Sequence, residues 1–198
     1  MSGRLDAAIA AIDAANADDP ETIMVNGEAR PKEQAHAEMM TAWVTRLDPT
    51  ASEEQLLAAR AHHLRRWSIP RSTYPDGRAG YLRWRTALKK QHAEQVAEIL
   101  RGTGYDDGSI GRVQQIVRKD GLASDAAVQT HEDALCLVFL ETQLLDLADQ
   151  LGDDKTVEVI RKTVVKMSER GVATALELDL PSRAVALVGR ALAADEKP

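Results

Sequence analysis

Apolar side chains in this 198-residue chain recur every three or four positions, which is the spacing of one face of an α-helix. Clear examples are the stripe from Met39 to Leu47 and the stripe from Leu137 to Leu151. β-branched residues occur singly or in pairs, without the apolar–polar alternation of a half-buried strand. The pattern therefore predicts an all-α protein.

Helix-capping and helix-breaking residues divide the chain into about seven to nine helices. Ser52 followed by Gln55 is a capping-box pattern, and Pro70 ends the helix that begins there. We expect helices at about residues 4–16, 31–47, 52–67, 81–101, 107–119, 130–151 and 153–169, and one or two short ones after them. The length suits one compact domain: an N-terminal helix and loop over residues 1–31, a core over residues 32–170 and C-terminal helices over residues 171–198.

Composition limits the environment and the partners of the chain. The net charge of −6 argues against general coating of DNA, so a nucleic acid is a less favoured partner. The single cysteine, Cys136, lies in an apolar run and suits a reducing compartment. The sequence shows neither a membrane-spanning apolar run nor a signal-peptide pattern. We therefore expect a cytoplasmic protein with no membrane partner.

Four polar side chains lie on the apolar faces of separate predicted helices: His36, His63, His92 and Asp133. A buried carboxylate is costly unless it is paired, and a divalent metal would satisfy all four groups together. Three histidines and one aspartate suit iron, manganese, zinc, cobalt or nickel better than calcium. Two alternatives stay open: hydrogen-bonded core histidines, and a capping box in which Asp133 bonds the helix start at Thr130. By the same helical geometry His62 and His131 point toward solvent, and we assign them no role.

Positive charge is concentrated between residues 60 and 90. This segment holds nine Lys and Arg residues and one acid, Asp76, so its charge is +8 while the rest of the chain carries −14. It also holds four of the seven aromatic residues. Guanidinium groups match phosphate oxygens in two-point contacts, so the segment predicts an anion site. Its alternative is a basic flank that pairs with acidic helices. The expected phosphate-binding residues are Arg60, Arg65, Arg66, Arg85 and Lys89.

Three strings resemble an uncharacterised bacterial and fungal family of helical domains of unknown function. They are HHLRRWSIPR at residues 62–71, GYLRWRTALKK at 80–90 and HEDALCLVFLE at 131–141. The likeness covers nearly the whole chain, and the family implies no activity.

The order of the polar residues is also similar to that of the HD-domain superfamily, which comprises helical metal-dependent phosphohydrolases and a few di-iron oxygenases. His36 matches the first His of that pattern, and the pair His62–His63 takes the place of its His-Asp doublet. His92 matches a further His and Asp133 the final Asp. The doublet here lacks its carboxylate, although a His at that position can still ligate a metal. The resemblance implies an HD-domain-like bundle around a divalent transition metal.

We therefore expect a metal-dependent phosphohydrolase that acts on a small phosphorylated molecule such as a nucleotide. Glu33 or Glu141, both near predicted inward faces, would act as general base. Two alternatives remain: a non-haem iron oxygenase, and a non-catalytic domain that binds an anion, a nucleotide or RNA through the basic segment.

Overall fold

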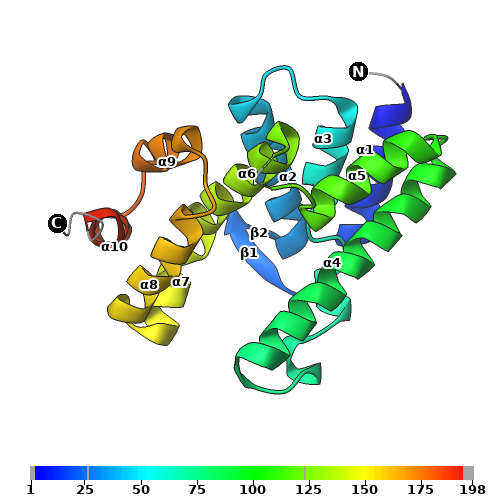
Figure 1. The fold of residues 1–198 in the computed structure, drawn as a ribbon. Coiled ribbons are helices and arrows are strands. Elements are labelled where there is room, and N and C mark those ends of the chain that lie inside the picture. The colour runs from blue at the N-terminus through cyan, green and yellow to red at the C-terminus, as the bar shows by residue number, and fades with distance from the viewer. Residues whose placement is uncertain (1–2, 26, 123, 194–198) are drawn as a thin grey trace. The chain divides into compact units, whose positions relative to one another are not determined.

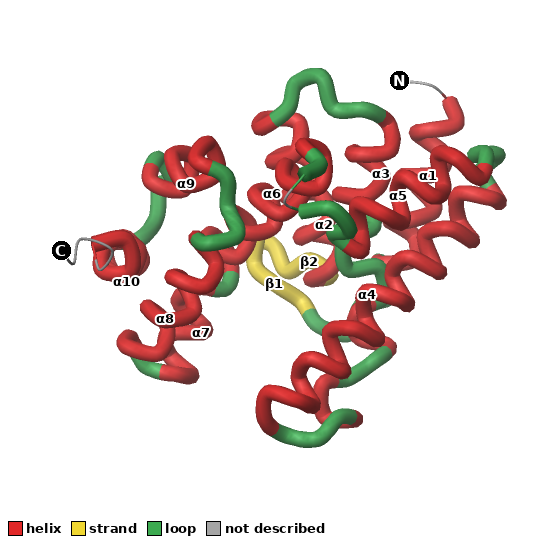
Figure 2. The backbone as a smooth tube through the Cα atoms, in the orientation of Figure 1, coloured by secondary structure: helices red, strands yellow, loops and turns green. Residues whose placement is uncertain are grey.

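The computed structural model describes residues 3–25, 27–122 and 124–193, and most of them are helical (Figure 2). Its ten α-helices and one two-stranded sheet confirm the predicted all-α class. The internal contacts of the chain separate two units, residues 1–131 and 132–198, where the sequence suggested one domain. The division falls inside helix α6 (Ala126–Thr142), and each unit is described by itself. Within the described residues, a helix with the length and apolarity to cross a membrane is not found.

The first unit contains five helices, a hairpin and the start of α6 (Figure 1). Two short 3₁₀ turns, Arg66–Ser68 and Arg71–Thr73, precede the long helix α4, which runs alongside α5. The elements in chain order are α1 (Gly3–Asn16), β1 (Thr22–Val25), β2 (Glu28–Pro31), α2 (Lys32–Leu47), α3 (Glu53–Arg60), α4 (Gly77–Gly102) and α5 (Asp107–Arg118).

The hairpin β1–β2 corrects the expectation that the chain has no strands. The strands pair antiparallel with Thr22 opposite Pro31 and Val25 opposite Glu28. Gly27 has φ +84°, a left-handed conformation that glycine adopts without steric cost. Strands of four residues are too short to produce an alternating pattern that stands out from a polar loop.

Helix α3 begins as predicted but ends early. The hydroxyl of Ser52 accepts a hydrogen bond from the backbone of Gln55, whose side chain accepts one in return, so the capping box is confirmed. The helix ends at Arg60, about seven residues before the expected end. The chain then turns through residues 61–65, and Arg65 takes a left-handed conformation with φ 49°. The side-chain oxygen of Asn16 accepts the backbone N–H of Arg65 at 3.0 Å and so holds this turn in place.

The core of the first unit lies between α1, α3, α4, α5 and the start of α6. Its fully buried side chains include Ile12, Leu57, Leu100 and Ile116. Burying side chains of this size stabilises the fold by roughly 1.5–3 kcal/mol each. This packing fixes α4 and the start of α6, which carry His92 and His131.

The second unit contains the rest of α6 and four further helices. The helix predicted over residues 130–151 is interrupted at Gln143, and the predicted helix 153–169 ends at Val164. Helix α6 begins at Ala126, where Asp125 accepts the N–H groups of the first turn. The capping role considered for Thr130 and Asp133 is therefore wrong. The further helices are α7 (Leu144–Leu151), α8 (Asp153–Val164), α9 (Glu169–Leu176) and α10 (Ser182–Leu192).

Candidate functional site: a histidine cluster beside a cationic pocket

All five histidines of the chain belong to the first unit, where they form one connected cluster. The rings of His62 and His63 lie 3.8 Å apart between centroids, and those of His63 and His92 lie 5.9 Å apart. His131 is hydrogen-bonded to His62, and His36 contacts the same carboxylate as His63. Five histidines from four separate stretches of chain therefore share one region.

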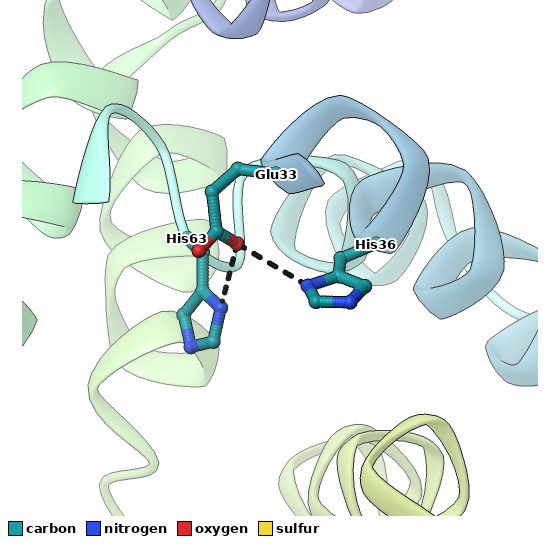
Figure 3. A group of neighbouring side chains, drawn as sticks. All are labelled: Glu33, His36 and His63. Carbon is teal, nitrogen blue, oxygen red and sulfur yellow. Dashed lines mark hydrogen bonds and ion pairs between the residues drawn. The ribbon is translucent and has the colours of Figure 1, made fainter. Parts of the chain in front are cut away.

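Glu33 and His36 lie one turn apart at the start of α2. The backbone N–H of Glu33 donates to Asp19 at 2.9 Å, which fixes the first turn of the helix. The Glu33 carboxylate is buried between two imidazoles (Figure 3). Its Oε2 lies 2.9 Å from Nδ1 of His63 and 3.6 Å from Nδ1 of His36. One donor atom from each of the three residues lies within 4.8 Å of the others, which is close enough for a shared metal ion.

His63 reaches this carboxylate because α3 ends before it. Its second ring nitrogen, Nε2, lies 2.9 Å from a guanidinium nitrogen of Arg66 and accepts a hydrogen bond from it. Nε of Arg66 also lies 3.9 Å from Oε1 of Glu33. The carboxylate, the imidazole and the guanidinium therefore form a closed group, joined by two hydrogen bonds and one longer ion pair.

His92 comes from the middle of α4 and is fixed through one ring nitrogen. Its Nδ1 lies 2.9 Å from the carbonyl oxygen of Leu64, so Nδ1 carries the proton and donates it. That tautomer leaves a lone pair on Nε2, the arrangement found in histidines that bind metals.

His62 and His131 are buried, and the expectation that they face solvent is wrong. Their exposed fractions are 6% and 1%, and Nδ1 of His62 lies 3.2 Å from Nε2 of His131. Adjacent residues of one helix point about 100° apart. Since the chain leaves the helix after Arg60, this relation no longer holds, and His62 and His63 line the same pocket.

Burial lowers the pKa values of four of the histidines and keeps them neutral at neutral pH. Loss of solvation is the largest cause, and it lowers the pKa of His92 to about 4 and that of His131 to about 3. The pKa values of His62 and His63 are held well below the ordinary value, first by burial and then by neighbouring histidines and Arg66. A neutral imidazole has a lone pair available for a metal or a hydrogen-bond donor.

Four of the five histidines have a buried ring nitrogen without a hydrogen-bond partner among the described residues. These atoms are Nε2 of His36, His62 and His92 and Nδ1 of His131. Buried polar atoms in native proteins are nearly always satisfied, so these four nitrogens are atoms that could bind a metal, a ligand or water. The donor set, imidazole nitrogens with one carboxylate, is the one that divalent transition metals prefer.

A narrow pocket between α4, α5 and the turn after α3 adjoins the cluster. It has a cavity volume of about 20 Å³, room for little more than one water-sized group. Its polar lining consists of three neutral histidines and four cations, without an acid among the lining residues. The histidines are His62, His63 and His92, and the cations are Arg66, Arg85, Lys89 and Lys119.

The predicted phosphate-binding residues divide into two groups. Arg66, Arg85 and Lys89 line the pocket. Arg60 instead donates to both carboxylate oxygens of Asp13, at 2.5 and 2.6 Å, and Arg65 is exposed. The structure therefore does not bring Arg60 and Arg65 to the pocket.

Asp133 and Glu141 belong to the second unit. The buried Asp133 accepts hydrogen bonds from the backbone N–H and the hydroxyl of Ser168, at 2.9 and 2.5 Å. It thereby fixes the residue that caps α9. Glu141 is exposed, so its predicted inward position is wrong. The prediction assumed one continuous helix, but α6 ends at the next residue, so the leucines beyond it do not define the inward face of α6.

Sequence reasoning missed three members of the site: His62, His131 and Lys119. The His62–His63 pair and the nearby cations are features of the sequence that indicate the site. The assumption of a continuous helix over residues 52–67 placed His62 on the solvent side. Lys119 has φ 61° at the C-terminal end of α5, a conformation that its sequence neighbours do not signal.

Comparison with known proteins identifies a family without assigning an activity. No curated protein and no solved structure matches the chain. One family model, described as Domain of unknown function (DUF4202), matches residues 6–188, a range that contains the whole histidine cluster and its pocket. The chain belongs to this DUF4202 family of domains of unknown function.

Proposed function

We propose that this protein is a metal-dependent hydrolase that acts on a small phosphorylated molecule. The observation that carries the proposal is the joint presence of unpartnered, neutral imidazole nitrogens, one buried carboxylate and a pocket lined by cations. Imidazoles and a carboxylate suit a metal, and cations that line a pocket without an acid among its lining residues suit a phosphoryl group. The order of histidines that resembles the HD-domain pattern supports the same function.

The proposed ligands are Glu33, His36 and His63. Their donor atoms are mutually within reach of one ion, and three protein ligands leave positions open for water and substrate, as in catalytic metal sites. Iron, manganese, zinc, cobalt or nickel would suit this set. A bound ion of this kind lowers the pKa of a coordinated water and stabilises charge on a phosphoryl oxygen.

The chain's own residues would bind and orient the phosphate. Arg66, Arg85 and Lys89 present N–H donors to its oxygens from one side of the pocket, where burial strengthens each contact. The unpartnered Nε2 of His92 faces a site from which it can orient the attacking water. Glu33 is proposed as a ligand and not as the general base, because its Oε2 already lies between two imidazoles. Asp133 is left out of the ligand set because Ser168 donates to both its oxygens.

The metal is tested on protein purified without a histidine tag and loaded in turn with iron, manganese, zinc, cobalt and nickel. We expect bound metal at a fixed ratio to protein, and release of inorganic phosphate from a panel of phosphate esters. Glu33→Gln and His63→Gln should remove most of the bound metal. The matched control is Glu38→Gln, five residues on in the same helix, where the carboxylate pairs with Arg30.

Full metal occupancy in both site variants would contradict the proposed ligands. Absence of metal from the loaded wild-type protein would contradict the hydrolase. Oxygen uptake by the iron-loaded protein, without release of phosphate, would identify an oxygenase instead.

A second candidate function is anion binding without a metal. In the closed group of Glu33, His63 and Arg66, both ring nitrogens of His63 have partners without an ion. A site that is complete without a metal favours anion binding over hydrolysis. Binding of inorganic phosphate that persists in chelator and weakens with salt, in a protein that releases no phosphate from esters, would support it over hydrolysis.

A further inference from the structure

A second, wider hollow is lined by residues of helices α4 and α5 and of the turn after α5. It encloses about 570 Å³ and shares Lys89 with the first pocket. Its charged lining also includes Lys90, Glu94, Arg118 and Asp120. The shared Lys89 places the two pockets side by side, so one molecule could contact both.

The two pockets differ in charge. The first has four cations and no acid in its lining, whereas the second has three cations and two acids. In the second, Lys90 pairs with Glu94 at 3.8 Å and Arg118 pairs with Asp120 at 3.0 Å. These cations are already partly neutralised, and the two carboxylates would repel a second phosphate.

The polar groups of the second hollow suit hydroxyls. The carboxylates of Glu94 and Asp120 accept hydrogen bonds from hydroxyl groups, while the adjacent cations and the amide of Gln114 supply donors. Interleaved carboxylates, cations and an amide match the alternating donors and acceptors of a polyol.

We infer that the substrate is a phosphate monoester whose leaving group carries hydroxyls, with its single phosphate at the first pocket and its polyol in the second. This inference rests on the proposed function and names its substrate class. Sugar phosphates and nucleoside monophosphates share the required chemistry. At about 20 Å³ the first pocket admits no chain of phosphates, and a single phosphate would lie at its entrance, against the lining cations.

Binding is measured first, by calorimetry on the metal-free protein in chelator, so that the result does not depend on catalysis. The probes are glucose 6-phosphate, AMP, ADP, inorganic pyrophosphate and n-butyl phosphate, which carries no hydroxyl. We expect at least one of the first two to bind about tenfold more tightly than the last three, a difference of about 1.4 kcal/mol. The affinities of glucose 6-phosphate and AMP are then compared. The tighter of the two shows whether the hydroxyls belong to a sugar phosphate or to a nucleoside monophosphate.

The double variant Glu94→Gln with Asp120→Asn tests the second hollow. It should narrow the preference for the tighter-binding hydroxyl-bearing monoester over ADP, because repulsion of the second phosphate and the hydroxyl acceptors are lost together. Glu98→Gln, an exposed position one turn further along α4, is the matched control and should keep the preference. Binding of ADP or pyrophosphate more tightly than both monoesters would overturn the inference. An unchanged preference for the monoester over ADP in the double variant would also overturn it.

Hydrolysis with the metal-loaded protein separates the two proposals. Release of phosphate from ADP or butyl phosphate but not from the hydroxyl-bearing monoesters would reject the inference and keep the hydrolase. Selective binding of the hydroxyl-bearing monoesters, with no hydrolysis of any ester, would reject the hydrolase and keep the binding preference.

Discussion

Gly171 in α9 lies against the carboxyl group of Asp133 inside the second unit. A Cβ atom added at Gly171 would lie 2.6 Å from Cγ of Asp133. The carboxylate cannot move aside freely, because it is buried and accepts two hydrogen bonds from Ser168. The absence of a side chain at Gly171 thus permits the contact that fixes the start of α9.

Gly171→Ala should therefore lower the free energy of unfolding by about 1–3 kcal/mol, the usual cost of forcing extra atoms into a packed site. The measurement is urea denaturation followed by circular dichroism. Gly189→Ala is the control in the same unit: it lies in α10, and among the described residues an added Cβ meets nothing within 4 Å. That variant should be neutral or slightly stabilising, since alanine favours helix. Equal effects of the two variants would contradict the argument.

At the residue scale, the sequence predicted the inward direction of His36 and His92 because each lies within a regular helix. It failed for His62, whose direction depends on where α3 ends. The turn after that end is held by the left-handed Arg65, whose backbone N–H donates a hydrogen bond to Asn16, about fifty residues earlier in the chain. A contact between such distant residues cannot be read from local periodicity.

At the element scale, the helices with sharp boundary residues were predicted well. The ends of α1 and α5 differ from the expected ones by one residue, and the capping box at Ser52 was found. The hairpin was missed although Asn26-Gly27, a dipeptide typical of tight turns, follows the apolar run Ile23 to Val25. The break at Gln143 was missed because the leucines continue across it, and leucine favours helix on both sides.

The capping box gives a prediction for α3. Ser52→Ala removes the acceptor for the backbone N–H of Gln55 and should cost about 1 kcal/mol of stability. Because α3 leads directly into the turn that carries His62 and His63, the variant should also weaken metal binding. Thr45→Ala, an exposed position inside α2, serves as control and should leave both properties nearly unchanged. Denaturation and metal titration on the same samples measure the two effects.

At the scale of the whole molecule, the buried histidines whose pKa values are lowered link stability to pH. The folded protein keeps His92 and His131 neutral, with pKa values of about 4 and about 3, whereas the unfolded chain protonates its histidines near pH 6.5. Their stabilising contribution is complete above about pH 6.5 and is lost as the pH falls toward these folded values. Each such histidine lowers the free energy of unfolding by about 1.4 kcal/mol for every pH unit that the pH falls in this range.

We therefore expect the free energy of unfolding to fall steeply between pH 6.5 and 5, a window in which ordinary carboxylates stay charged. Urea denaturation at several pH values, in the presence of chelator, measures the slope. His131→Gln removes one titrating group, so unfolding should take up about one proton fewer in this window. The slope of the free energy of unfolding against pH should be shallower accordingly. A stability that stays flat across this window would show that the cluster is not buried in solution.

If an ion binds at the proposed site, the cations at the pocket would also affect how it enters and leaves. A divalent ion that approaches His63 through this pocket passes Arg66, Arg85, Lys89 and Lys119 and is repelled before it meets an imidazole. The residence time of a bound ion is then governed by this barrier as well as by its ligands. Exchange with the buffer is slow in dilute salt and faster when salt screens the entrance.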